Sequence, residues 1–254
     1  MKKFEFTGET KTTITGRVLH RIRALIDIHA GLFLNVKAGD LGGWLEKEEN
    51  LSQDGNAWVY GNARVYGNAR VCDDAWVCDD AWVYGNAWVY GNARVCDDAW
   101  VYGNARVCDD ARVCDDARVC DDARVCDDAV VKKFDHYLTV GPIGSRNDTT
   151  TFFRNAKGII KVKCGCFIGT IDAFLEKVTE THSNNKHAVA YRAAAALAVA
   201  QIDTTVTDDE PPKQREIVKP DFLNRVLHTG FNSTAAIADE NPFSNNTNTD
   251  KEEK

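Results

Sequence analysis

Hydrophobic and polar positions repeat every six residues through the middle of this chain. Alanine recurs thirteen times at this step, from Ala57 to Ala129, and valine follows two residues later each time, from Val59 to Val131. A helix with 3.6 residues per turn would drift out of phase with this spacing, whereas a strand places residues two apart on the same face. The spacing therefore predicts short strands whose Ala and Val side chains point inward.

Each repeat ends in a pair of residues that favours a tight corner. The unit reads Ala, then Arg or Trp, then Val, followed either by Tyr-Gly-Asn or by Cys-Asp-Asp. Gly, Asn and Asp tolerate the backbone angles that a corner needs. Short strands that alternate with corners at a fixed step predict a solenoid.

The repeat resembles that of the hexapeptide-repeat family, the trimeric LpxA-like proteins that fold as left-handed parallel β-helices, in the form found in phage and prophage proteins. In that family an aliphatic residue and a small residue two positions before it face inward, as Val and Ala would here. The resemblance implies three hexads per triangular coil. We therefore expect a mainly β protein: a left-handed parallel β-helix of about four coils over residues 57–131, with a small C-terminal α+β module.

Residues 18 apart should stack, which sorts the outward positions onto three faces. One face is the most aromatic, and we expect it to be the binding surface. Its residues are Trp82, Trp100, Tyr66, Tyr84, Tyr102, Arg64 and Arg118. Three interpretations stay open: ladders of stacked side chains that stabilise neighbouring rungs, burial against another subunit or the flanking segments, and a platform for a sugar or peptide.

Non-repetitive segments flank the hexads. Residues 1–56 resemble the N-terminal cap of prophage-type hexapeptide proteins, and we expect Trp44 to plug the first coil. Residues 132–203 predict the small α+β module, and residues 204–254 predict a linker and a largely disordered tail. The elements expected in the module are strands at Tyr137–Val140, Thr150–Phe153 and Ile159–Phe167, a helix capped by Thr170, and a second helix near Lys186 to Gln201.

Charge is concentrated in the repeat. The chain of 254 residues has a net charge of −7, and residues 57–130 hold 7 arginines and 14 aspartates with no lysine or glutamate. The remaining 24 basic and 24 acidic residues balance each other. An acidic repeat disfavours nucleic acid as a partner, because phosphate backbones need a positive surface. Apolar runs stay below the roughly 18 residues of a membrane helix, so we expect no membrane contact.

Cysteine usage and metal chemistry leave alternatives open. Nine cysteines, seven of them in the repeat, argue against a secreted disulfide framework and favour the cytoplasm of a bacterial host. We expect no cofactor, but stacked Asp corners are compatible with Ca²⁺ and stacked thiols with a soft metal. The order Cys164, Cys166, His182, His187 is compatible with Zn²⁺, although the first pair is closer than the usual finger spacing.

The positions of the histidines bear on catalysis. Acyltransferases of the hexapeptide family use a histidine near a coil loop, at a cleft between trimer subunits. All six histidines here lie outside the repeat, so the coil surface lacks a general base. We expect a non-enzymatic scaffold or binding module of phage or prophage type, which binds a protein or ligand partner or associates with itself, for instance as a trimer. An acyltransferase-like enzyme acting at a trimer interface is the alternative.

Overall fold

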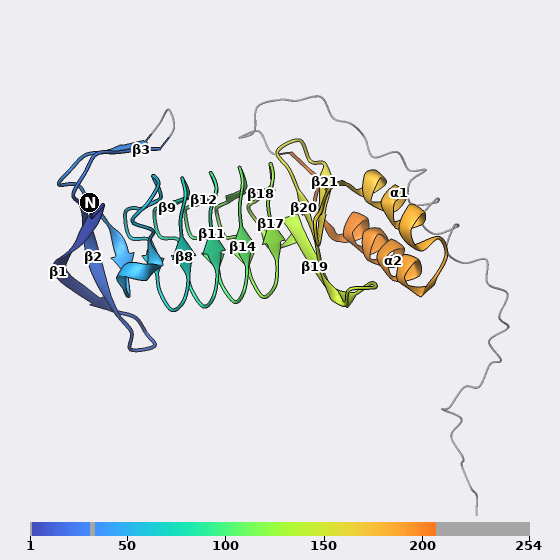
Figure 1. Cartoon of the computed structure of the whole chain (residues 1–254), viewed down its shortest axis with the longest axis horizontal. Helices are drawn as coiled ribbons and strands as arrows, with labels where there is room; N and C mark the ends of the chain where they lie inside the picture. Colours follow the sequence, from blue (N-terminus) through green and yellow to red (C-terminus); the bar gives the residue numbers. More distant parts are fainter. Residues whose placement is uncertain (1, 31–33, 207–254) are drawn as a thin grey trace, which may run out of the picture.

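The protein is elongated, with a solenoid between two end modules (Figure 1). The computed structural model describes residues 2–30 and 34–206. Most of the segment predicted as linker and tail, from residue 207 to residue 254, lies outside the described residues. His228 lies there too.

The hexads form most of a parallel β-solenoid of about five turns. Each hexad contributes one two-residue strand, and strands 18 residues apart pair in parallel, as Trp82 does with Trp100. These strands are β6 (Trp58–Val59), β7 (Arg64–Val65), β8 (Arg70–Val71), β9 (Trp76–Val77), β10 (Trp82–Val83), β11 (Trp88–Val89), β12 (Arg94–Val95), β13 (Trp100–Val101), β14 (Arg106–Val107), β15 (Arg112–Val113), β16 (Arg118–Val119), β17 (Arg124–Val125) and β18 (Val130–Val131).

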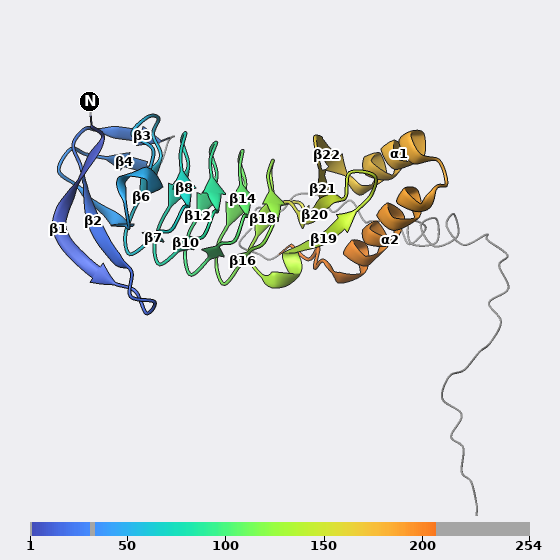
Figure 2. The ribbon, with the colours of Figure 1, turned by 60° about the horizontal axis from the view of Figure 1, so that its bottom comes forward.

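Three sheets form the sides of the solenoid (Figure 2). The first face contains β6, β9, β12, β15 and β18; the second contains β5 (Leu41–Leu45), β7, β10, β13 and β16; the third contains β8, β11, β14 and β17. The hexads make the expected four coils, and the segment before them extends the solenoid to about five turns. The extra turn arises because β5 pairs in parallel with β7 ahead of the first hexad, and Leu51 bridges to Val71. The left hand of the coil stays a prediction from the resemblance.

The Ala and Val positions form the core of the solenoid, as the six-residue step predicts. Every hexad Ala and every hexad Val has 0% exposure, and burying each Val stabilises the fold by about 2 kcal/mol. The first corner residue takes a left-handed conformation in both hexad types, with φ of +74° at Gly85 and +57° at Asp97. Gly and Asp can alternate at this position because both tolerate positive φ.

The N-terminal module extends the second face. It contains β1 (Phe4–Thr12), β2 (Val18–Ala24), β3 (Ile28–Ala30), β4 (Leu34–Val36) and a 3₁₀ turn at Glu48–Asn50. Strand β2 pairs antiparallel with β1 and with β5, so the sheet continues from the hairpin into the solenoid.

Side chains of this module close the open end of the solenoid. Phe4, Ile22 and Leu45 lie in the solenoid core, and Lys3 Nζ donates to the Ala57 carbonyl at 2.9 Å. The prediction that Trp44 plugs the first coil is wrong. Adjacent strand residues point to opposite faces, so Leu45 points inward and Trp44 packs outside.

The C-terminal module is a four-stranded antiparallel sheet covered by two helices. It contains a 3₁₀ turn at Phe134–His136, β19 (Tyr137–Ile143), β20 (Asp148–Arg154), β21 (Ile160–Cys164), β22 (Phe167–Thr170), α1 (Ile171–His182) and α2 (Lys186–Gln201). The segment expected as one strand over residues 159–167 begins a hairpin, because Gly165 turns the chain at a φ of +58°. The Thr170 cap is confirmed: its hydroxyl accepts from the Ala173 amide. No helix in the described part of the chain is long and apolar enough to cross a membrane.

The sheet of this module also closes the second end of the solenoid. On β20, Phe153 lies in the solenoid core, whereas Phe152 faces the helices and meets Phe174 edge-on. At the rim, Lys161 Nζ lies 2.9 Å from Asp127 Oδ2. One sheet thus separates two hydrophobic cores and fixes the module on the solenoid.

Candidate functional site

The predicted binding surface exists as two parallel columns on the second face. In the outer column, which we call the Trp ladder, Arg64, Trp82, Trp100 and Arg118 follow one another on successive rungs. The Trp82 and Trp100 rings are stacked, with centroids 5.0 Å apart and planes inclined by 8°. The Arg64 guanidinium lies 4.5 Å from the Trp82 ring centroid, and that of Arg118 lies 4.9 Å from the Trp100 ring centroid.

The second column, the Tyr column, runs beside the Trp ladder through Tyr66, Tyr84 and Tyr102. Consecutive rings are stacked at 5.0 and 5.1 Å and are nearly parallel. The columns touch edge to face, for example Tyr66 against Trp82 at 6.3 Å. Burial raises the pKa of Tyr66 to about 12. All seven residues predicted for this surface are therefore brought together.

The stacking decides what the surface can present. Both ring faces of the tryptophan pair are covered, by each other and by the two arginines. A sugar platform needs an open ring face, so the geometry favours the ladder interpretation and leaves ring edges and guanidinium groups outward. Edges of this kind, with Arg beside them, suit a protein partner.

A groove that the sequence did not predict adjoins the Tyr column. It measures about 620 Å³ and lies between the β1–β2 hairpin and the second face. Arg17 lies 6.0 Å from the Tyr66 ring centroid and pairs with Glu46 at 2.8 Å. Glu46 also accepts from the Gly67 amide at 2.6 Å. No sequence signal places Arg17 here, because the contact depends on how the hairpin folds against the solenoid.

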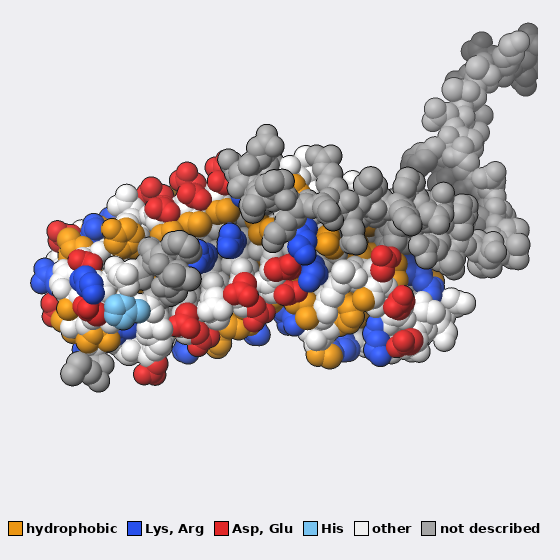
Figure 3. All heavy atoms as spheres, turned by 90° about the horizontal axis from the view of Figure 1, so that it is seen from above, with side chains coloured by type: hydrophobic (Ala, Val, Ile, Leu, Met, Phe, Trp, Pro, Cys, Tyr) orange, Lys and Arg blue, Asp and Glu red, His pale blue; other side chains and the backbone are white. Residues whose placement is uncertain are grey.

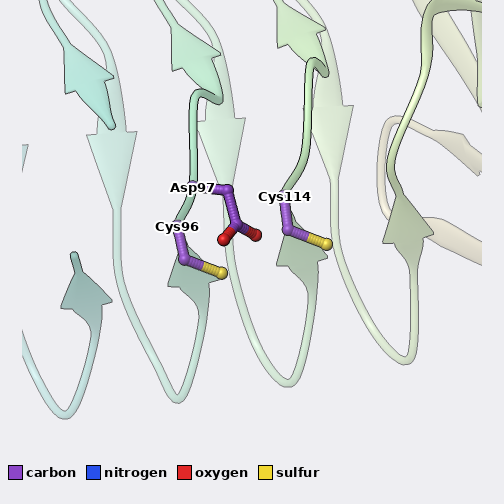
Figure 4. A group of neighbouring side chains, drawn as sticks. All are labelled: Cys96, Asp97 and Cys114. Atoms are coloured by element: carbon purple, nitrogen blue, oxygen red, sulfur yellow. The ribbon is translucent and has the colours of Figure 1, made fainter. Parts of the chain in front are cut away.

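Cysteines form a column of their own on the first face. Cys78, Cys96 and Cys114 occupy successive rungs and constitute what we call the thiol column. Figure 4 shows Cys96, Asp97 and Cys114, whose sulfur and carboxylate oxygen atoms lie within 4.8 Å of one another. Among the described residues, a second group with metal-ligating side chains this close is formed by Cys108, Asp109 and Cys126 on the third face.

Cys108 and Cys126 are joined by a disulfide in the structure, with Cα atoms 4.7 Å apart. The cysteine count argued against a secreted disulfide framework and did not predict this pair. Stacking at the 18-residue step brings two Cα atoms into the 4.4–6.8 Å range that disulfides require. The closeness of these two cysteines could be predicted from the six-residue step, because any two Cys-Asp-Asp hexads 18 residues apart must stack.

Hydrogen bonds from amide groups offset the repulsion between the aspartates stacked at the corners. Asn104 Nδ2 donates to Asp122 Oδ1 at 3.0 Å, and Asp97 Oδ2 accepts from the Asp115 amide at 3.3 Å. Figure 3 shows acidic side chains in rows along the solenoid, beside hydrophobic ones. Neither metal-competent group found among the described residues consists of carboxylates alone.

The four residues proposed for zinc do not come together as a site. The Cys164 thiol lies 3.3 Å from the Thr150 hydroxyl and 3.8 Å from that of Tyr191, whereas Cys166 is exposed. The His182 and His187 rings are neighbours at 5.7 Å. In the described part of the chain, no metal-competent group includes any of these four residues.

Comparison with known families agrees with this fold. The sequence profile of the YdcK β-solenoid repeat matches residues 57–73, 63–79 and 87–103, all within the hexads. No match is found among curated proteins. The chain therefore carries a β-solenoid repeat domain, which is similar to the YdcK repeat over these segments.

Proposed function

We propose that this protein is a non-enzymatic scaffold whose second face binds a protein partner. The observation that carries the proposal is the Trp ladder, which holds two tryptophan edges between two arginines on a backbone that cannot easily move. Each rung is tied to the next by main-chain bonds, such as that from the Trp82 amide to the Ala99 carbonyl at 2.9 Å. Because this surface is already ordered, binding a partner would cost little conformational entropy on the side of the solenoid.

Both end modules support a scaffold role. Each is joined to the solenoid through shared core residues, Phe4 at one end and Phe153 at the other. The solenoid therefore holds the two modules at a fixed separation. A protein that binds the second face would be placed at a defined position between them.

The placement of the histidines supports a role without catalysis. His20 packs against Phe6 in the N-terminal module, and His29 bonds Asn35 there. His136 is buried beneath the C-terminal module, where burial lowers its pKa to about 4. The described histidines thus lie away from the outward positions of the hexads, where a coil-surface general base would have to act.

The biological setting is part of the proposal. The resemblance to hexapeptide-repeat proteins of phages and prophages supports a bacterial cytoplasmic protein of that origin. Self-association through the second face, for instance as a trimer, is the second candidate, because Trp, Tyr and Arg are enriched at such interfaces.

The test compares two faces that carry the same chemistry. The double variant Trp82→Ser/Trp100→Ser removes the ring edges of the second face. The variant Trp88→Ser is the matched control, because Trp88 on the third face also lies between two arginines, Arg70 and Arg106. Native mass spectrometry and cross-linking in a bacterial lysate should show loss of a defined complex in the double variant only.

The outcomes separate the candidates. A complex with a second protein, lost in the double variant and kept in the control, supports the proposal. A homo-oligomer that dissociates in the same variant supports self-association and revives the trimer-interface enzyme as an alternative. Equal binding by the wild type and by both variants contradicts a role for the second face.

A further inference from the structure

The thiol column has a geometry that neither the fold nor the scaffold role requires. Its three sulfur atoms lie on successive rungs, and the middle residue, Cys96, has a cysteine on each side. The Cys96 and Cys114 sulfurs lie within 4.8 Å of each other and of an Asp97 carboxylate oxygen. The thiols are partly exposed, so an ion in solution can reach them.

The spacing suits one class of ligand. Bonds between a soft metal and thiolate sulfur are about 2.3 Å long, so an ion midway between two sulfurs joins atoms roughly 4.6 Å apart. The rungs are arranged in a line, which leaves Cys78 on the far side of Cys96 from Cys114. Cu(I) accepts an arrangement with one sulfur on each side of the ion, and thiolate ligands select this metal.

We propose that Cys96 and Cys114 bind one Cu(I) ion between two rungs of the first face. The two thiols each lose a proton and form a sulfur–copper bond, so the bound state carries a net charge of −1 and two protons go to solvent. The copper stays Cu(I) throughout, and no electron is transferred. The Asp97 carboxylate lies beside the two thiols (Figure 4).

The charges around the column are compatible with this exchange. The hydrogen bond with Cys96, together with burial, raises the pKa of Cys114, whereas nearby Lys132 lowers it. The hydrogen bond with Cys114 lowers the pKa of Cys96, but the bond with Cys78 and burial outweigh it and raise that pKa to about 12. Burial and the hydrogen bonds between thiols thus favour the protonated forms of Cys96 and Cys114 in the absence of a metal.

The experiment uses the full chain in a background that removes the other stacked pair, Cys108→Ser/Cys126→Ser. The reduced protein is titrated anaerobically with Cu(I) buffered by bathocuproine disulfonate, and stoichiometry is read by native mass spectrometry. Cys96→Ser should weaken Cu(I) binding at least about 100-fold, more than the loss of an outer-shell group would. It breaks both neighbouring sulfur pairs at once, because Cys78 and Cys114 are two rungs apart.

Two matched variants make the result specific. Cys78→Ser leaves the Cys96–Cys114 pair intact and should change the affinity less than about threefold. Cys120→Ser replaces a cysteine in the same hexad position whose sulfur has the Tyr137 hydroxyl, not a thiol, 3.8 Å away, and it should also bind normally. Serine fits these outward positions, so thermal melting should show all variants folded.

Three results would overturn the proposal. They are undiminished Cu(I) binding by Cys96→Ser, an equal loss in Cys120→Ser, and a loss in Cys78→Ser as large as in Cys96→Ser. The first two would leave scattered single thiols as the ligands. The third would assign the ion to the Cys78–Cys96 pair instead.

Discussion

Trp82 lies parallel to Trp100 on the next rung of the solenoid, with ring centroids 5.0 Å apart. The parallel register of β10 and β13 pairs these two residues directly, so their stacking follows from the 18-residue step. Because Arg64 and Arg118 cover the outer ring faces, the ladder stabilises the solenoid along its axis. Under the proposed function, the same residues stabilise the solenoid through their ring faces and bind the partner through their edges.

A double-mutant cycle should measure how much the stacking of Trp82 on Trp100 contributes to stability. Trp82→Ser and Trp100→Ser should each lower the free energy of unfolding, with a coupling of about 1 kcal/mol between them, since stacked aromatic pairs are worth this much beyond their burial. Urea denaturation of the four proteins gives the coupling. The cycle of Trp88→Ser with Trp100→Ser should give a coupling near zero, because these residues lie on different faces. Equal couplings in both cycles would contradict the ladder.

The inward register of valine predicts a severe effect at Val95. This residue has 0% exposure in the middle of the solenoid, and Val95→Asp would bury a carboxylate with no partner. We expect loss of the cooperative thermal transition and of most β-structure by circular dichroism. Arg94→Ser, at the adjacent outward position, should melt within a few degrees of the wild type. A cooperative transition retained in Val95→Asp would show that the register is wrong.

The solenoid was predictable because its information is local and repeated. Each hexad repeats the same inward Ala, inward Val and corner. The 18-residue spacing then predicts that Trp82 stacks on Trp100, whatever the structure of the two end modules. The ends were harder, since they are fixed by contacts between segments distant in the sequence. Nothing near Leu45 or Phe153 indicates that these side chains complete the core of the repeat.

The same contrast holds for the candidate site. The aromatic columns followed from the repeat, but the guanidinium of Arg17 reaches Tyr66 from a hairpin almost fifty residues earlier in the chain. The zinc proposal failed for a related reason. Spacing in sequence suggested that Cys164 lies near His182. The partly buried Cys164 thiol instead contacts the Tyr191 hydroxyl, and the two histidines lie at the ends of two helices.

Phe153 should hold the C-terminal module on the solenoid. Its side chain has 0% exposure and lies in the solenoid core, so Phe153→Ala should cost about 4 kcal/mol through lost burial and the cavity left behind. Hydrogen exchange should locate the loss in β17 and β18, because repeat proteins transmit stability between neighbouring turns. Phe134→Ala, at a residue that is 61% exposed, should cost less than about 1 kcal/mol. If the two variants lose the same free energy of unfolding, Phe153 does not hold the module through its packing in the solenoid core.

His136 should make stability depend on pH below neutrality. The side chain is 3% exposed, and its Nδ1 accepts from the Lys132 amide at 3.0 Å, which requires an unprotonated nitrogen. Burial, helped by the charge of Arg154, lowers its pKa from 6.5 to about 4, although Asp135 and Asp203 oppose the change.

The unfolded chain therefore binds this proton more readily than the folded protein. The stabilising contribution is present above pH 6.5 and is lost as the pH falls towards 4, by about 3 kcal/mol in total. His136→Asn keeps an acceptor for the Lys132 amide and cannot be protonated in this range. The free energy of unfolding, measured by urea denaturation at each pH, should thus fall more steeply for the wild type than for the variant between pH 6.5 and 4. A constant difference across that window would mean that His136 is already protonated in the folded protein, or that it titrates equally in both states.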